Sequence, residues 1–383
     1  MCKGAYDMLH IPVTQAKSDS ARSRIYRYLY ENKDFCAKQT LAKQCEISMP
    51  TLYQNLSELM DDGLVRYSGE EQSTGGRRAQ GLEIVPDARF AVGVSVMETR
   101  LRLAAADLRL NELAYQEVPF ADISQLPEQT AVIRRSLESF LEDKHLERGR
   151  LLGVGITIPG IVTPECDRIV MAPTLHLTDT PLHGLTRDIP YPVFIENDAS
   201  SSGYAEWFAR GGQRNMAYFS LENGVGGAVV VGGIPYGGDN SRSGEFGHIC
   251  VEPGGLPCSC GRRGCLEAYC SARRISDELD VSLPEFFDGV ERHEPACEAL
   301  WWDMLRHLAI GINNVHMALD CDVVLGGLLS EYLGPYLPVL ERYVLSGNPF
   351  ARDARFVQLS RLRRHIAPLG AALHFVREFA YSV

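Results

Sequence analysis

One histidine and three cysteines are spaced closely enough in the sequence to bind a metal ion together. They follow the pattern H-x9-C-x-C-x4-C and are His248, Cys258, Cys260 and Cys265. Imidazole and thiolate groups in such a set can complete a closed tetrahedral zinc site, with no position left open for a substrate. The pattern therefore favours structural zinc. The segment "CSCGRRGCLE" alone would also suit a nucleic-acid finger, a redox centre or reduced cysteines without metal.

Glycines and arginines lie between the cysteines of this segment. Gly261 and Gly264 allow the backbone to turn tightly around an ion, because glycine adopts conformations closed to other residues. Arg262 and Arg263 would offset the negative charge of three thiolates. Both features are expected of a loop that wraps a metal.

The composition is that of a globular protein with more than one domain. The chain has 383 residues, 45% of them hydrophobic and 23% charged, and a net charge of -11. No apolar run approaches a membrane span or a secretory signal, so we expect a cytoplasmic protein with no membrane partner. Eleven cysteines, mostly scattered, are expected to be reduced residues of the core.

The first 85 residues predict a DNA-binding unit. They carry as many basic as acidic residues, so the acidic excess lies downstream. The segment "KQTLAKQCEISMPTLYQNLSELMDDGLV" predicts two helices with a tight break between them. Ser48 is the expected N-cap of the second helix, which should end at Gly63. That helix is expected to bury an apolar stripe made of Leu52, Leu56, Leu59 and Met60.

Alternating residues around "SGEEQSTGGRRAQG" predict a hairpin after these helices, and hence a winged helix-turn-helix. Its second helix would enter the major groove of double-stranded DNA and its wing would contact the backbone. The candidate DNA-binding residues are Thr51, Tyr53, Gln54, Asn55, Arg77 and Arg78. The neutral charge leaves open a three-helix protein-interaction module instead. We expect the isolated unit to bind DNA.

From about Phe90, short apolar strands alternate with glycine-rich turns and helices. Examples are "LLGVGITIPGIV", "VFIENDASSSGYAEWFARGG" and "DVVLGGLLSEYL". Repeats of this kind predict an α/β architecture with sites at the strand ends. Two such sets predict two lobes with a cleft between them.

The segment "GEFGHICVEPGGLPCSCGRRGCLE" resembles the zinc and sugar-binding motif of the ROK family (repressor, open reading frame, kinase). The order of "TGGR", "GITIPGIV", "IENDAS", "GVGGAVVVGG", "INNVHMALDCDVVLGGLLS" and "APLGAALHF" agrees with that family over roughly residues 20 to 380. The resemblance implies a two-lobed, actin-like sugar-kinase fold after the winged helix-turn-helix. We expect the DNA-binding domain at 18–86, the first lobe at 90–200 and the second at 201–383, with the C-terminal helix returning to the first lobe.

The resemblance also implies a sugar site. Family kinases use the aspartate of a Glu-Asn-Asp turn as general base on the sugar hydroxyl, and here that residue is Asp198. The other sugar contacts of the family fall on Asn197, Glu245, His248 and Glu267. His248 would then serve both the metal and the sugar, so loss of zinc would misplace a binding residue.

The ATP side departs from the family pattern. Its kinases carry an Asp-x-Gly-Gly-Thr hairpin at the phosphates, whereas this sequence has "SVMET". Ser95 replaces the aspartate, and Met97 and Glu98 replace the glycines. In the second phosphate loop, Gly-Thr-Gly has become Glu222-Asn223-Gly224. Two added carboxylates would repel a triphosphate, so we expect no phosphoryl transfer and regard Asp198 as a vestigial base.

The sequence therefore predicts a sugar-responsive transcriptional regulator, a repressor, with an inactive kinase fold as its sensor. Its expected partners are a DNA operator, a sugar or sugar phosphate, and a second copy of the chain in a homodimer or homotetramer. The alternative function is that of an enzyme, an ATP-dependent sugar kinase that also binds DNA.

Overall fold

The described part of the chain begins with three helices and a two-stranded hairpin, here called the N-terminal unit (residues 20–88). The computed structural model describes residues 20–32, 36–70, 80–120, 126–182, 188–363 and 365–383. The unit consists of α2 (Ala21–Glu31), α3 (Lys38–Gln44), α4 (Met49–Asp61), β1 (Val65–Glu70) and β2 (Gln80–Ile84). The helices α3 and α4 and the hairpin follow one another in the predicted order. The tip of the hairpin, with Arg77 and Arg78, lies outside the described residues.

The helix α4 begins and ends at the predicted residues. The Ser48 hydroxyl oxygen accepts a hydrogen bond from the Thr51 N–H over 3.3 Å, as an N-cap does. Gly63 follows the helix with a φ of +68°, a conformation that favours glycine. Leu52, Leu56 and Leu59 are buried, and Met60 is half-buried. The helix α4 thus presents its other face to solvent.

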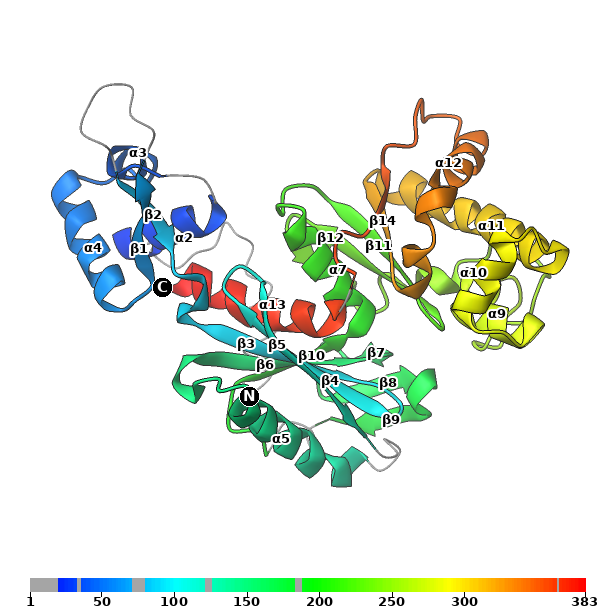
Figure 1. The fold of residues 1–383 in the computed structure, drawn as a ribbon, viewed down its shortest axis with the longest axis horizontal. Helices are drawn as coiled ribbons and strands as arrows, with labels where there is room; N and C mark the ends of the chain where they lie inside the picture. The colour runs from blue at the N-terminus through cyan, green and yellow to red at the C-terminus, as the bar shows by residue number, and fades with distance from the viewer. Residues whose placement is uncertain (1–19, 33–35, 71–79, 121–125, 183–187, 364) are drawn as a thin grey trace.

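A twisted sheet forms the first lobe, with strand order β10-β6-β3-β4-β5. Its strands are β3 (Phe90–Val96), β4 (Arg100–Asp107), β5 (Glu112–Pro119), β6 (Leu151–Ile158) and β10 (Val193–Asn197). In Figure 1, α5 (Leu126–Asp143) lies on one face of this sheet and α13 (Ile366–Ser382) on the other. A small sheet follows β6 and contains β7 (Ile161–Val162), β8 (Arg168–Ala172) and β9 (Leu177–Pro181).

The second lobe is built on a sheet with strand order β13-β12-β11-β14-β15. The strands are β11 (Met216–Leu221), β12 (Val225–Val231), β13 (Ile234–Pro235), β14 (Asp322–Gly326) and β15 (Val357–Leu359). Helices lie beside it: α8 (Leu266–Cys270), α9 (Ala272–Leu279), α10 (Leu283–Glu291), α11 (Pro295–Leu319) and α12 (Leu337–Ser346). In the described parts of the chain, no helix has the length and apolar character needed to cross a lipid bilayer.

Two helices join the lobes. α7 (Asp198–Ala209) starts at the end of β10 and packs on β11 and β12 of the second lobe. α13 packs against α7, β3 and β6. Glycines permit this close approach, since a Cβ on Gly93 would lie 1.7 Å from the Pro368 carbonyl oxygen and one on Gly370 would lie 1.8 Å from that of Ser201. A side chain at either position would force these elements apart.

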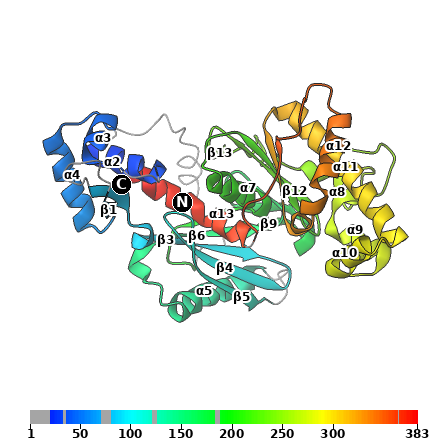
Figure 2. The same cartoon turned by 45° about the horizontal axis from the view of Figure 1, so that its top comes forward.

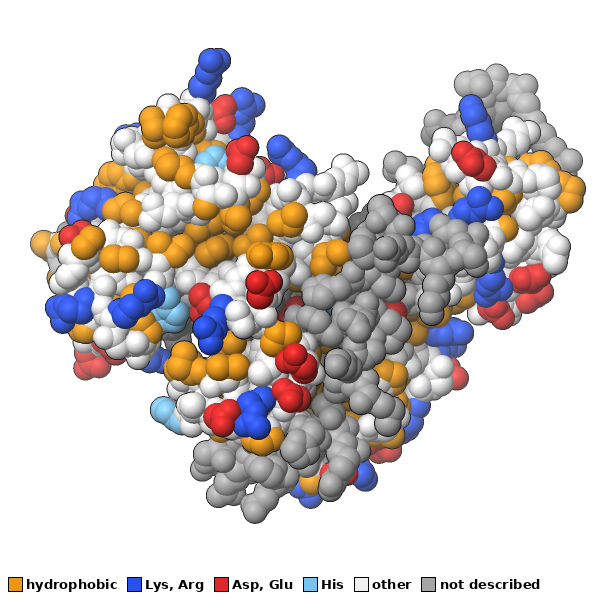
Figure 3. Space-filling model, turned by 180° about the vertical axis from the view of Figure 1, so that it is seen from behind, with side chains coloured by type: hydrophobic (Ala, Val, Ile, Leu, Met, Phe, Trp, Pro, Cys, Tyr) orange, Lys and Arg blue, Asp and Glu red, His pale blue; other side chains and the backbone are white. Residues whose placement is uncertain are grey.

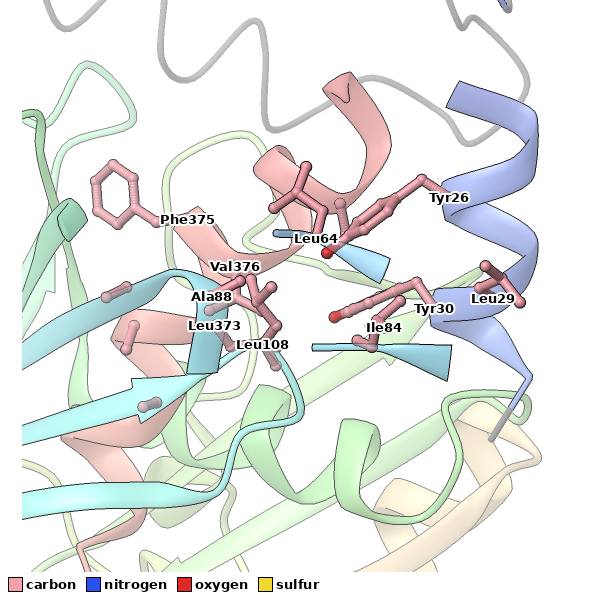
Figure 4. Close-up of a cluster of buried hydrophobic side chains, with 14 of the residues drawn as sticks. Tyr26, Leu29, Tyr30, Leu64, Ile84, Ala88, Leu108, Leu373, Phe375 and Val376 are labelled. Carbon is pink, nitrogen blue, oxygen red and sulfur yellow. The ribbon is translucent and has the colours of Figure 1, made fainter. Parts of the chain in front are cut away.

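The N-terminal unit and the first lobe share one apolar core. Tyr26, Leu29 and Tyr30 of α2 belong to the same cluster as Leu373 and Val376 of α13. Figure 4 shows the α2 tyrosines pointing toward the strands and the last helix. Figure 2 shows α13 running from the sheet of the first lobe to the N-terminal unit. The unit is therefore packed onto the first lobe rather than tethered to it.

An arginine of the first lobe caps α2. The Arg109 guanidinium donates hydrogen bonds to the carbonyl oxygens of Tyr30 and of Leu29, the latter over 2.9 Å. These carbonyls belong to the last turn of α2, where helical partners run out and positive charge is favourable. The contact adds a polar tie to the shared apolar core. Seen from behind, a notch separates the unit from the second lobe (Figure 3).

Candidate metal centre and interlobe site

The four predicted metal ligands come together in the structure. One ligand atom from each of His248, Cys258, Cys260 and Cys265 lies within 4.8 Å of all the others. The Sγ atoms of Cys260 and Cys265 are 3.7 Å apart, and Cys258 Sγ is 3.6 Å from His248 Nδ1. In a tetrahedral zinc site, with Zn–S distances of about 2.3 Å, such ligand atoms lie roughly 3.5–3.8 Å apart. The donor set suits a tetrahedral metal ion, and these two pairs of ligand atoms have the spacing of such a site.

Local backbone structure places these ligands. His248 ends a short 3₁₀ helix at Phe246–His248, and Cys265 is the N-cap residue of α8. Between them the chain folds back on itself, with the Cys258 N–H donating to the Arg262 carbonyl oxygen over 2.8 Å. Gly264 has a φ of +82°, and a Cβ there would lie 1.9 Å from the Glu252 carbonyl oxygen. The loop needs glycine at that position.

Positive charge at the cluster comes from Arg262. Burial opposes ionisation of Cys260, but hydrogen bonds from Arg262 and from the neighbouring thiols lower its pKa to about 6. The Arg262 guanidinium also donates to the His248 carbonyl oxygen over 2.6 Å. Arg263 was expected to share this role, but it donates to the Gly254 carbonyl oxygen over 3.3 Å. A thiolate is the form of cysteine that binds metal, so Arg262 favours binding.

Glu267 is held by the metal loop and by the second lobe. Its Oε1 accepts a hydrogen bond from the Ser259 hydroxyl over 2.9 Å, and its Oε2 accepts one from the Val225 N–H over 3.0 Å. Ser259 lies between two of the ligand cysteines. The loop that surrounds the metal position thus orients a carboxylate that the sequence assigned to the sugar site. Ser259 was missed because nothing in its spacing marks it as more than a spacer.

The two ring nitrogens of His248 face different groups. Nδ1 faces Cys258 Sγ, whereas Nε2 lies 3.9 Å from Glu245 Oε2. This is the division that one nitrogen on a metal and one toward a ligand hydroxyl would require. The structure therefore brings His248 and Glu245 together beside the metal cluster, as the predicted site needs.

Asn197 and Asp198 lie where β10 passes into α7. Asn197 caps the helix by accepting the Ser200 N–H over 2.9 Å, and its amide donates to the Gly160 carbonyl oxygen over 3.0 Å. Burial raises the pKa of Asp198 to about 6, backbone N–H groups including that of Ala199 partly offset this, and the charge of Glu245 adds to the rise. The charge of Glu245 therefore acts on Asp198, although the two residues belong to different elements.

The two lobes, with the metal cluster and the residues around Asp198, match a known protein family. Residues 91–375 match the ROK family. The chain belongs to the ROK family. That match covers both lobes described above, including the metal cluster and Asp198.

Relatives of this ROK protein include regulators and kinases. A putative xylose repressor of Caldicellulosiruptor sp. (strain Rt8B.4) is 27% identical over 337 residues, 80% of this chain and 83% of that protein. A glucokinase of Halalkalibacterium halodurans is 30% identical over 253 residues, 65% of this chain and 74% of that enzyme. The crystal structure of a ROK family transcriptional regulator, a homolog of the E. coli MLC protein, has a TM-score of 0.77. It is 21% identical, and the alignment covers 94% of this chain and 96% of the other, so the fold is shared almost throughout.

The segments that the family resemblance assigns to ATP phosphates carry side chains at Met97, Glu98 and Glu222. Met97 and Glu98 form the turn between β3 and β4, in which the Met97 N–H donates to the Arg100 carbonyl oxygen over 3.0 Å. Ser95, in β3, is buried. Glu222 is exposed at the surface, but desolvation of its carboxyl group by the surrounding protein raises the pKa of that group to about 7. The charge of Asp198 adds to that rise and thus disfavours ionisation of Glu222.

The residues assigned to DNA on α4 differ in how freely they can reach a partner. Tyr53 and Gln54 are exposed. Thr51 is half-buried and its hydroxyl pairs with that of Ser48 over 2.8 Å. Asn55 is half-buried as well, and its amide donates to the Thr51 carbonyl oxygen over 2.8 Å. Tyr53 and Gln54 are therefore the more accessible to a DNA partner.

Proposed function

We propose that this ROK protein is a sugar-responsive, DNA-binding transcriptional repressor. The observation that carries the proposal is the position of α13. At His374 this helix contacts Glu196, the residue before Asn197, with 3.1 Å between His374 Nε2 and Glu196 Oε2. Near its end, the Tyr381 hydroxyl donates to Glu31 of α2 over 2.7 Å. One rigid element thus touches the neighbourhood of the sugar residues and the N-terminal unit.

The sugar site of the proposal consists of Asn197, Asp198, Glu245, His248 and Glu267. Carboxylates and an imidazole suit sugar hydroxyls, which both donate and accept hydrogen bonds. The names of relatives such as the xylose repressor support a sugar as the effector. Zinc is the metal proposed for the cluster, where it would hold His248 and, through Ser259, Glu267 in place. Its role there is structural, because four protein ligands leave no open position.

The proposed repressor does not transfer phosphate. Side chains at Met97 and Glu98 occupy the turn where kinases of this family place glycine, and Glu222 adds a carboxylate near Asp198. Charges of like sign near a triphosphate raise the free energy of its binding. A sugar kinase that also binds DNA is the second candidate, favoured by the glucokinase relative and by the presence of Asp198.

The proposed mechanism is linkage between sugar and operator. A sugar that prefers one arrangement of the lobes changes the position of α13 and hence of the two winged helices in a homodimer. A coupling free energy of ~1–3 kcal/mol would change operator affinity by ~5- to 150-fold. A symmetric dimer is the smallest assembly that reads a palindromic operator with one winged helix per chain.

Two assays separate the candidates. A duplex selected by the protein from random sequence is titrated in a gel-shift experiment with and without neutral sugars and sugar phosphates. If the protein is a sugar-responsive repressor, one sugar should change its affinity for that duplex. A coupled ADP-release assay with the same sugars should give no turnover above background, whereas turnover abolished by Asp198→Asn would establish the kinase.

A further inference from the structure

We infer that Lys38, Tyr53 and Tyr67 together bind one phosphate of the DNA backbone, between α4 and the hairpin. The inference rests on the proposed DNA-binding function and deepens it by naming a contact. The three residues come from different elements: Lys38 begins α3, Tyr53 lies on α4 and Tyr67 lies on β1. They are here called the Lys38 cluster.

The Lys38 ammonium lies between the two tyrosine rings. Its Nζ is 5.0 Å from the centre of the Tyr53 ring and 4.9 Å from that of Tyr67. The same Nζ donates a hydrogen bond to the Tyr67 hydroxyl oxygen over 2.9 Å. Distances below about 6 Å are those of cation–π contacts, which orient an ammonium group. The lysine is therefore held in place before any partner arrives, so less conformational entropy is lost on binding.

The Lys38 cluster offers several hydrogen-bond donors that have no partner in the cluster itself. An ammonium has three N–H groups, and Tyr67 uses one of them. Because the Tyr67 oxygen accepts that bond, its own O–H is directed toward some other acceptor. Tyr53 is 52% exposed and Tyr67 is 45% exposed, so these donors lie at the surface. A group with several acceptor oxygens and a negative charge is the matching ligand.

Lys38 differs from Arg22 and Arg66 in its ionic contacts. Within the described residues, no carboxylate lies within ion-pair distance of Lys38. Arg22, by contrast, pairs with Asp62 over 2.5 Å, and Arg66 pairs with Glu83 over 2.8 Å. Lys38 is thus a surface cation beside α4 with no partner among the described carboxylates, and it can pair with an external anion. Lys38 can therefore bind an anion, whereas Arg22 and Arg66 are already paired with carboxylates.

The position of the cluster selects the DNA backbone as that anion. A recognition helix in the major groove is flanked on both sides by phosphates, and contacts to them set its register. The Lys38 cluster lies at the contact between α4 and β1, beside the exposed face of α4. A phosphate bound there would fix the helix and the hairpin against one strand. Such a contact carries no sequence information itself.

The test is the salt dependence of DNA binding by the full chain. The probes are a duplex selected by the wild type from random sequence and one unrelated duplex, both titrated over a series of KCl concentrations. Lys38→Gln should weaken both by a similar factor, roughly 3- to 10-fold, and lower the slope of log K against log salt by ~0.9. Lys38→Arg should retain the slope. Tyr67→Phe should weaken binding by less and leave the slope unchanged, because it removes a donor but no charge.

Arg22→Gln is the matched control, since it removes a cation of the same unit that is already paired with Asp62 and Glu58. It should leave the slope as in the wild type. Thermal melting of each variant separates a loss of folding from a loss of contact. A Lys38→Gln slope equal to that of the wild type overturns this inference while DNA binding stands. No binding of any duplex by the wild type overturns the proposed function and the inference with it.

Discussion

Arg377 of α13 donates a hydrogen bond to the Tyr204 hydroxyl oxygen of α7 over 2.5 Å. The same guanidinium donates to the Gly233 carbonyl oxygen of the second lobe over 2.7 Å and lies over the Tyr381 ring. Tyr381 in turn contacts Glu31 of α2. Arg377 therefore lies where α13, the second lobe and the route to the N-terminal unit meet.

Substitution of Arg377 should weaken the sugar response more than DNA binding. In Arg377→Gln, motion of the second lobe would reach α13 with fewer contacts, so we expect the sugar-induced change in operator affinity to shrink at least threefold. Affinity without sugar should change less than twofold. Gel-shift titrations with and without the effector measure both quantities. An unchanged sugar response in a folded Arg377→Gln protein would show that coupling takes another route.

Loss of the metal should affect the sugar site before the DNA-binding unit. Cys260→Ser removes one ligand, which releases the loop carrying Ser259 and His248 and leaves Glu267 without the Ser259 hydrogen bond. We expect bound zinc to be lost, the melting temperature to fall, and the sugar response to disappear while DNA binding persists.

Metal analysis, thermal melting and gel-shift titration of one preparation test this prediction. Cys297→Ser is the matched control, because Cys297 is a buried cysteine outside the cluster. Its metal content should equal that of the wild type. A full sugar response in metal-free Cys260→Ser protein would contradict the structural role of the ion.

The buried carboxylate Glu206 should be important for stability. It is fully buried and accepts hydrogen bonds from the Ser360 hydroxyl over 2.7 Å, from the N–H groups of Arg361 and Leu362, and from Arg210. These bonds fix the segment that leads from β15 to α13. Glu206→Gln breaks a buried charge pair and should cost about 3 kcal/mol of unfolding free energy.

Urea unfolding monitored by circular dichroism gives that free energy. Glu142→Gln is the control, since Glu142 pairs with Arg148 at an exposed position, where such pairs contribute roughly 0–1 kcal/mol. Equal losses in the two variants would mean that Glu206 does not hold the segment.

Stability should depend on pH through Asp198. Its pKa is raised by burial from 3.8 to about 6, so the folded protein holds this proton more tightly than the unfolded chain does. The resulting stabilisation is complete below the unfolded pKa and is lost as the pH rises through about 6. Asp198→Asn should therefore gain about 1–3 kcal/mol relative to the wild type between pH 4.5 and pH 7.5. A difference between the two proteins that stays constant over this range would exclude the raised pKa.

Local patterns made some parts of the site predictable. The metal ligands lie within eighteen residues of chain, and the tight turns at Gly261 and Gly264 let that short segment fold back on itself. The start and end of α4 followed from Ser48 and Gly63 because caps act on the adjacent turn. The candidate sugar residues came from resemblance to the family and not from spacing.

Contacts between distant segments were not predictable in this way. The Ser360 hydroxyl meets Glu206 across 154 positions, and Tyr381 meets Glu31 across 350. No periodicity in one helix reveals which distant element will cover it. For the same reason, the expectation that the isolated DNA-binding unit works alone changes. Tyr26 and Tyr30 pack in a core shared with α13. A unit cut off after residue 86 would therefore expose apolar surface and should fold poorly.

The sensor hypothesis is tested most directly by titrating the selected duplex with the full-length protein at a series of sugar concentrations. We predict that one sugar or sugar phosphate changes the dissociation constant by ~5- to 150-fold, and that Asp198→Asn abolishes this change while leaving binding without sugar intact. A dissociation constant that no sugar in a broad panel alters, in protein with its metal bound, would contradict it.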